Sequence, residues 1–319
     1  MARQPRAEEA QRVDAEALVI VSASYRTDIP AFYADWFRRR LAAGQVRVRN
    51  PYGGSDSLVS LRPPDCEGFV FWTRNLDPFW PALDEVRALK LPFVVQFTLT
   101  GYPRALEPAV IPEARGLDQL RKLVAEQGGR TAVWRYDPVF ATDLTPPSWH
   151  RETFTRLADA LADVVDEVVL SFAQIYAKTR RNTDKAAARH GFAWQDPPEE
   201  DKRTLLVELS EIARSRGLSA SLCSQPELLG EGGLFGGPEP ARCIDAQRLS
   251  DVANAWGMAS PIAARTKGNR PGCLCAESRD IGAYDTCPHG CSYCYAVSAS
   301  ERAKTYRRQH DPQVERLGD

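Results

Sequence analysis

The sequence lacks several features that would assign a class of protein at once. It has only 4 histidines and 2 methionines in 319 residues, and it contains no HExxH zinc motif and no Walker phosphate loop. No apolar stretch approaches the roughly 18 residues of a membrane span. Residues 1–17 are charged and have no apolar core, so we expect no secretory signal peptide.

An excess of charge of one sign is also missing. The 41 lysines and arginines face 42 aspartates and glutamates, and the formal net charge is −1. Net charge therefore gives no support for a nucleic-acid partner, although a local basic groove stays open. Hydrophobic residues at 43% and charged residues at 26% are ordinary for a globular domain. We expect a cytoplasmic protein that does not bind membranes.

Cysteine, in contrast, is abundant and clustered. Five of the 8 cysteines lie between Cys273 and Cys294. Without a signal peptide, this clustering indicates metal or redox chemistry more than disulfides. Cys66 stands alone before an apolar run and is interpreted as a small buried hydrophobic residue.

The densest cysteine group has the spacing C-x3-C-x2-C and consists of Cys287, Cys291 and Cys294. On a loop that contains proline and glycine, three thiolates can converge on one metal centre. Iron–sulfur clusters normally take four cysteine ligands, so three predict a [4Fe–4S] cubane with one iron open to a substrate or cofactor. The alternative is a structural zinc site closed by a fourth ligand, for which His289 is the local candidate.

Four other cysteines form a second candidate group: Cys223, Cys243, Cys273 and Cys275. Four thiolates can ligate a closed [4Fe–4S] cluster or a structural zinc ion, and separate buried thiols are the remaining reading. Residues 223–278 are rich in loops and poor in core-forming periodicity, so a metal would stabilise this segment. We predict an auxiliary cluster.

Short apolar runs alternate with amphipathic stretches along the chain. Near-continuous apolar runs predict buried parallel strands, and the alternation predicts right-handed βαβ units. The expected strands are 18–22, 68–73, 93–100, 131–136, 167–172, 218–223 and 279–284, and the expected helices are 29–43, 79–89, 116–127, 148–165, 199–216 and 296–309. We predict an α/β fold, a partial or closed (β/α) TIM-like barrel of six to seven parallel strands with a cysteine-rich C-terminal region.

Four segments follow from this pattern. Residues 1–17 are expected to be a flexible tail, residues 18–222 the barrel core, residues 223–278 a loop-rich segment with the auxiliary metal site, and residues 279–319 the last β-loop-α unit with the C-x3-C-x2-C loop. Within the core, 45–50 and 57–61 suggest a β-hairpin. Residues 178–201 are interpreted as a solvent loop or lid.

Polar side chains gather where the apolar runs end, which in a parallel barrel is the rim that carries the chemistry. Arginine suits a carboxylate, and aspartate or asparagine suits a ribose or an amine. A rim in which these side chains only bond one another is the structural alternative. The candidates for cofactor binding are Arg26, Thr27, Asp28, Arg74, Asn75, Gln96, Arg135 and Asp137. His150, His190 and His310 are expected at the surface.

Several of these motifs together resemble one family, the group called domain of unknown function 1848. They are Ser22-Ala-Ser-Tyr-Arg26-Thr27-Asp28-Ile-Pro30, Phe71-Trp72-Thr73-Arg74-Asn75, Gln96-Phe-Thr98-Leu-Thr100-Gly101, Trp134-Arg135-Tyr136-Asp137-Pro138 and the C-terminal cysteine block. The resemblance covers nearly the whole chain from about residue 18. The family looks like radical S-adenosylmethionine (SAM) proteins of circularly permuted order, with the cluster loop after the last strand. The loop string is also similar to that of spore photoproduct lyase.

The resemblance implies a function. A [4Fe–4S] cluster would bind SAM at its open iron and cleave it reductively, and the 5′-deoxyadenosyl radical would act on an unknown substrate. Tyr293 is implied to lie near the adenine, and an electron donor such as flavodoxin or ferredoxin is the implied partner. Two alternatives remain: a structural zinc-binding protein without radical chemistry, and a photoproduct-lyase-like DNA repair enzyme.

Overall fold

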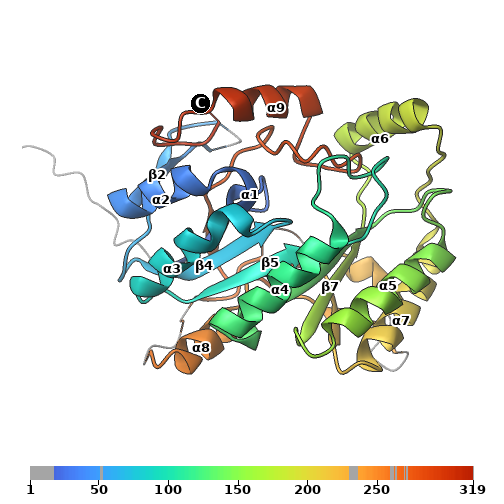
Figure 1. Ribbon diagram of the computed structural model, residues 1–319, viewed down its shortest axis with the longest axis horizontal. Coiled ribbons are helices and arrows are strands. Elements are labelled where there is room, and N and C mark those ends of the chain that lie inside the picture. The colour runs from blue at the N-terminus through green and yellow to red at the C-terminus, as the bar shows by residue number, and fades with distance from the viewer. Residues whose placement is uncertain are drawn as a thin grey trace, which may run out of the picture.

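The computed structural model of the protein describes residues 18–50, 53–229, 236–258, 262, 264–268, 270 and 272–318. The predicted tail, residues 1–17, lies outside the described residues. The fold is α/β, with one large parallel sheet between two layers of chain (Figure 1). Among the described helices, none has the length and apolar character that a membrane crossing requires.

The parallel sheet contains eight strands in the order β10-β1-β4-β5-β6-β7-β8-β9. All seven predicted strands are present, and the prediction missed only the two-residue β9. The edges β10 and β9 do not pair with each other in the described residues, so the sheet is open there. The strands are β1 (Val19–Ala23), β4 (Cys66–Thr73), β5 (Phe93–Thr98), β6 (Ala132–Val139), β7 (Glu167–Phe172), β8 (Ser219–Leu222), β9 (Glu239–Pro240) and β10 (Ser278–Asp280).

The expected helices and the hairpin are also found, with shifted ends. They are α1 (Ile29–Phe32), α2 (Ala34–Ala43), α3 (Trp80–Ala88), α4 (Glu113–Gln127), α5 (Pro147–Leu161), α7 (Glu199–Arg214), α9 (Ser300–Gln309), β2 (Gln45–Val48) and β3 (Ser57–Ser60). Three 3-10 turns cover Asp77–Phe79, Gly129–Thr131 and Pro226–Leu228. Gly44, in the left-handed region at φ 79°, ends α2 as a C-cap.

Two helices contradict the predictions. The stretch interpreted as a solvent loop or lid contains α6 (Ala177–His190), and the loop-rich segment contains α8 (Ala246–Ala255). Helix α6 has no apolar stripe, because its buried residues are Thr179 and Thr183, and so hydrophobic periodicity could not reveal it. Helix α8 begins at an N-cap, Asp245, whose side chain accepts from the backbone N–H groups of Gln247 and Arg248.

The two faces of the sheet are buried against different layers. One face packs its aromatic side chains against α2, α3, α4, α5 and α7, which lie in front of the sheet in Figure 1. The other face presents an apolar row that packs against α8 and residues 241–276: Ile20, Val70, Val94, Val133 and Val169. Because side chains alternate along a strand, the residues two positions further on share this second face. They are Ser22, Trp72, Gln96, Arg135 and Ser171, so the face becomes polar toward the carboxyl ends of the strands.

The last strand is tied to the first by one buried carboxylate. Asp280 accepts hydrogen bonds from Ser22 Oγ at 3.0 Å, Ser24 Oγ at 2.7 Å, and the backbone N–H groups of Tyr25 and Gly282, both at 3.0 Å. A Cβ at Gly282 would lie 2.0 Å from Ser24 Oγ, so this close approach requires glycine. Burial raises the pKa of Asp280. The junction sets where the C-x3-C-x2-C loop starts.

The expectation that His150 lies at the surface is wrong. Its side chain is 1% exposed, with Nδ1 2.8 Å from Tyr136 Oη and Nε2 3.3 Å from the Phe140 carbonyl oxygen. Burial lowers the pKa of His150 to about 4. The ring is therefore neutral in the folded protein at pH values where it is protonated in an unfolded chain.

This pKa predicts an acid sensitivity. Above about pH 6.5 the ring is neutral in both states, and as the pH falls toward about 4 only the unfolded chain takes up the proton. The free energy of unfolding should decrease over this range by on the order of 3 kcal/mol more in the native chain than in His150→Gln. Urea unfolding at pH 7, 5.5 and 4 measures it. The exposed-site variant His190→Gln should keep the native slope, and an equal slope in His150→Gln would contradict the assignment.

Candidate functional site

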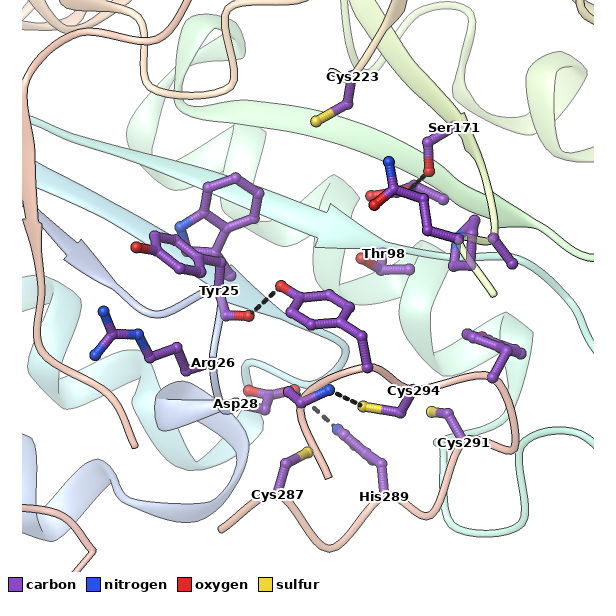
Figure 2. Close-up of a pocket in the computed structure, with 18 of the residues that line it drawn as sticks. Tyr25, Arg26, Asp28, Thr98, Ser171, Cys223, Cys287, His289, Cys291 and Cys294 are labelled. Atoms are coloured by element: carbon purple, nitrogen blue, oxygen red, sulfur yellow. Dashed lines mark hydrogen bonds and ion pairs between the residues drawn. The ribbon is translucent and has the colours of Figure 1, made fainter. Parts of the chain in front are cut away.

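A cavity opens at the carboxyl ends of the central strands and is lined by the three loop cysteines and by one cysteine of the second group, Cys223. Figure 2 shows Cys287, Cys291 and Cys294 along one loop on one side of it, with Cys223 across from them. Arg26 and Asp28, after β1, also line this cavity. This is the end of a parallel sheet at which ligands bind in α/β proteins.

The conformation of the cysteine loop follows from local contacts. Asp285 has a φ of +63°, which aspartate tolerates, and its carboxylate accepts from the backbone N–H and the hydroxyl of Ser298. Gly290 has a φ of +75° directly before Cys291, and its Cβ would meet Pro108 Cγ and Ser300 Oγ, each at 3.1 Å. Tyr33 Oη donates to the Thr286 carbonyl oxygen at 2.6 Å. Contacts with Tyr33, Pro108, Ser298 and Ser300 thus hold the loop in this conformation.

The three loop cysteines are free thiols in a pocket that three arginines also line. Burial, and next the nearby carboxylate of Asp28 and the two other sulfurs, raises the pKa of Cys287 well above its ordinary range. Burial raises the pKa of Cys291 to about 12 and also raises that of Cys294. Three mutually repelling thiols are stable as thiolates only against added positive charge, which a metal centre supplies.

The described residues contain no group of three or more His, Cys, Asp or Glu side chains arranged to hold a single metal ion. The loop cysteines fit a cluster by their chemistry and shared cavity, because a cubane gives each thiolate its own iron. His289, the local candidate for a fourth zinc ligand, points its Nε2 at Asp28 Oδ2, 2.8 Å away. His289 therefore takes part in a hydrogen-bond network with Asp28 and not in a ligand set with the three thiols.

Asp28 is the centre of that network. Besides His289, its carboxylate accepts from the Ala31 N–H at 2.9 Å, Thr73 Oγ1 at 2.7 Å and the Arg74 N–H at 2.9 Å. These donors belong to α1, the end of β4 and the cysteine loop. The carboxylate is 7% exposed and has no acceptor position left over for a ligand's amine, so it acts here as a brace.

Arg74 and Tyr293 share a buried carboxylate that sequence reasoning missed, Glu107. Arg74 Nη1 donates to Glu107 Oε1 at 2.7 Å and its Nη2 to Tyr293 Oη at 2.9 Å, while Tyr293 Oη donates to Glu107. Burial raises the pKa of Tyr293 well above its ordinary range. Glu107 lies in the irregular connection between β5 and α4, where neither periodicity nor a motif marks it.

Arg26 and Thr27 differ from their neighbours because they carry polar atoms without partners. Thr27 is 5% exposed, and its Oγ1 has no hydrogen-bond partner in the described residues. The Nε of Arg26 also makes no hydrogen bond there and lies 3.6 Å from Asp280 Oδ1. Both residues line the cavity. Buried polar atoms of this kind indicate a missing ligand or solvent.

The other predicted rim residues divide into two sets. Asp137 lines the cavity, and its carboxylate accepts from Ser171 Oγ and Arg135. Asn75 lies outside the cavity wall, and its Oδ1 accepts from Gln119 at 2.8 Å. Gln96 and Arg135 lie behind the wall. The structure therefore brings together Arg26, Thr27, Asp28, Arg74, Asp137 and Tyr293 around the cavity, and leaves out Asn75, Gln96 and Arg135.

The second cysteine group also comes together. Cys223 and Cys243 have their sulfurs 3.4 Å apart, Cys243 is hydrogen-bonded to Cys275, and Cys275 to Cys273. The hydrogen bond with Cys243, and then burial, raises the pKa of Cys223 well above its ordinary range. Four sulfurs from three separate stretches thus form one chain of contacts. Cys66 lies apart, buried, with Sγ 3.6 Å from the Gly68 carbonyl oxygen.

Three aromatic residues and Arg270 complete the cavity and were not predicted: Tyr25, Trp72, Tyr295 and Arg270. Trp72 Nε1 donates to Ser22 Oγ at 3.0 Å, and Tyr295 Oη donates to the Tyr25 carbonyl oxygen at 2.6 Å. The alternation along β4 could have placed Trp72 beside Val70 on the cavity face. Arg270 has its guanidinium 5.9 Å from the Tyr295 ring, a contact without a sequence signal.

The chain was compared with known proteins. A family model described as "Domain of unknown function (DUF1848)" matches residues 20–296. The search of curated proteins gives no match. A solved structure named "Crystal structure of D-hydantoinase" is similar at 13% identity and a TM-score of 0.30, over 65% of this chain and 41% of that chain. The chain thus spans about two fifths of that protein's length, and a similarity at this score supports no argument.

The brace role of Asp28 predicts a stability effect. Asp28→Ala removes the acceptor of four buried donors and should lower the free energy of unfolding by about 3 kcal/mol. Urea unfolding of the metal-free protein measures it. Asp84→Ala, at an exposed position of α3, is the matched control and should stay within about 0.5 kcal/mol of the native chain. Equal stabilities of the two variants would rule out the brace.

Proposed function

The chain belongs to the domain of unknown function 1848 family, and we propose that it is a radical SAM enzyme that generates a 5′-deoxyadenosyl radical with a [4Fe–4S] cluster. The observation that carries this proposal is the placement of Cys287, Cys291 and Cys294. Three free thiols on one loop line a cavity at the carboxyl ends of parallel strands, beside unpartnered polar atoms. Three thiolates would leave the fourth iron open to SAM.

The sheet order supports the permuted form of this family. Strand β10, which leads into the cysteine loop, lies next to β1 at the sheet's edge. In space the loop therefore follows the edge strand and precedes β1, although it comes last in the chain. We propose that β10 is the first barrel strand of a circularly permuted radical SAM fold and that β1 is the second.

The chain's own residues would bind and orient SAM beside the cluster. The Oγ1 of Thr27, which has no hydrogen-bond partner in the described residues, and the guanidinium of Arg26, whose Nε lies 3.6 Å from Asp280 Oδ1, are donors suited to a carboxylate. Arg74 holds Glu107 and Tyr293 beneath the cysteine loop, and Asp28 holds His289, so these five residues keep the loop in place. The cluster would supply the electron that cleaves SAM, and the aromatic residues that line the cavity would keep water from the radical.

We further propose that Cys223, Cys243, Cys273 and Cys275 hold a second [4Fe–4S] cluster. The group offers four thiols from a segment whose described part has one α-helix, and a closed ligand set needs four. A structural zinc ion is the alternative for this group.

A soluble donor such as flavodoxin or ferredoxin would deliver the electron, and the protein would work in the cytoplasm on a substrate that is still to be identified.

Reconstitution with iron and a cysteine variant test the radical chemistry. Anaerobic reconstitution should give a brown protein with two cubanes that releases 5′-deoxyadenosine and methionine from SAM and a reductant. Cys291→Ala should abolish this cleavage and lose about half of the iron, because one cubane loses a ligand. Cys66→Ala, in a cysteine outside both groups, should keep both. Unchanged SAM cleavage in Cys291→Ala, or a colourless protein that holds only zinc, would overturn the proposal.

A variant of Cys275 tests whether the two cysteine groups act separately. Cys275→Ala should lose the other half of the iron, retain SAM binding, and expose residues 223–278 to proteolysis because their metal ligand set is broken. Iron analysis, SAM binding by equilibrium dialysis, and limited trypsin digestion measure these effects. Loss of SAM binding with full iron content would show that the groups do not act separately. Stoichiometric zinc in this group would replace the second cluster by a structural site.

A further inference from the structure

Arg135 links the four-cysteine group to the cavity wall. It is 3% exposed, and its Nη1 donates to Cys243 Sγ at 3.2 Å and to Gln96 Oε1 at 3.1 Å. On its other side, Nε donates to Asp137 Oδ2 at 2.8 Å. One guanidinium therefore contacts a sulfur of the second cysteine group and a carboxylate of the cavity.

Arg135 makes more contacts than its ion pair with Asp137 requires. A buried arginine is stabilised by a carboxylate, and the Nε and Nη2 of Arg135 already donate to one carboxylate oxygen of Asp137, Oδ2. The remaining nitrogen points at a sulfur, which is a weak acceptor as a thiol and a strong one as a thiolate. Arg248, equally buried at 2% exposure, differs because it pairs with Asp166 and Glu167 and contacts no sulfur. Of these two buried arginines, Arg135 alone has a contact with a cysteine sulfur among the described residues.

The groups that hold Arg135 also line the cavity. Its guanidinium carbon lies 4.9 Å from the centre of the Trp72 ring, and Asp137 accepts a second hydrogen bond from Ser171. Trp72, Asp137 and Ser171 all line the cavity that the loop cysteines share. A ligand bound against this wall would contact Trp72, Asp137 or Ser171. These residues position Arg135, and Asp137 offsets its positive charge.

We propose that Arg135 is a positioning residue that tunes whatever redox group the four cysteines hold and couples it to the cavity through Asp137. The inference rests on the second cluster of the proposed function. A cationic donor to a ligating sulfur stabilises the reduced, more negative state of a cluster and raises its reduction potential. Asp137 offsets that charge, so the two residues act in opposite directions.

The test isolates the second group in a Cys291→Ala background, in which the loop cluster is missing. After reconstitution, iron analysis and EPR-monitored redox potentiometry give the midpoint potential of the remaining cluster. Adding Arg135→Gln should lower this potential, by about 59 mV for each tenfold weakening of the reduced form. Adding Asp137→Asn should raise it, because the positive charge of Arg135 is no longer offset. Arg248→Gln is the matched control and should leave it unchanged.

The outcomes separate the two proposals. A Cys291→Ala protein that retains zinc or no metal overturns the second cluster, and the role of Arg135 with it. A protein that retains about four irons, but with equal potentials in Arg135→Gln and Arg248→Gln, overturns the role of Arg135 alone. Shifts of the same sign in Arg135→Gln and Asp137→Asn would show a general disturbance of packing and also overturn it. If Arg135→Gln fails to fold, Asp137→Asn decides by the direction of its shift.

Discussion

The structure depends on the hydrogen bonds that converge on the carboxylate of Asp28. Its four donors come from the first turn of α1, the end of β4 and the cysteine loop, which are far apart in the chain. Each donor would be costly to bury without a partner, so the carboxylate determines how these elements meet. The thiols of Cys287 and Cys291, on either side of His289, take their positions from that contact.

A common pattern occurs beside each cysteine group. Arg74 pairs with Glu107 beneath the loop cysteines, and Arg135 pairs with Asp137 beside Cys243. Arg74 directly follows β4 and Arg135 lies within β6, where the sheet changes from apolar packing to a polar wall. A buried ion pair is a costly substitute for apolar packing. Two such pairs beside the cysteine groups indicate that local charge has a role at this end of the sheet.

Hydrophobic pattern predicted most of the fold. Six strands could be read because parallel strands buried on both faces are near-continuous apolar runs, as in Phe93–Thr98. The seventh, β10, has the sequence Ser-Arg-Asp and shares only residues 279 and 280 with the predicted strand 279–284. Helix α6 could not be read, because it buries threonines and leaves charged residues outside. His150 was placed wrongly because a single polar residue does not show which partner it has. Its partner, Tyr136 Oη, comes from a neighbouring strand.

The site was predicted in part for the same reason. Cysteine spacing marks both thiol groups, and the ends of apolar runs mark Arg26, Arg74 and Asp137. The sequence does not tell whether such a side chain faces the cavity, as Asp137 does, or lies behind the wall, as Arg135 does. Glu107 and Arg270 lie in irregular segments, where only tertiary contacts decide position. The roles assigned to the cofactor-binding residues stay predictions.

The position of β10 has a consequence for how the protein is made. Strand β1 ends at Ala23 and its edge partner begins at Ser278, so most of the sheet leaves the ribosome before that partner does. At roughly 5–20 residues per second, the delay is on the order of tens of seconds. During synthesis the nascent sheet thus exists without its cysteine loop. A chain that stalls before Ser278 can present most of the sheet, but its cavity lacks the side that the three loop cysteines form.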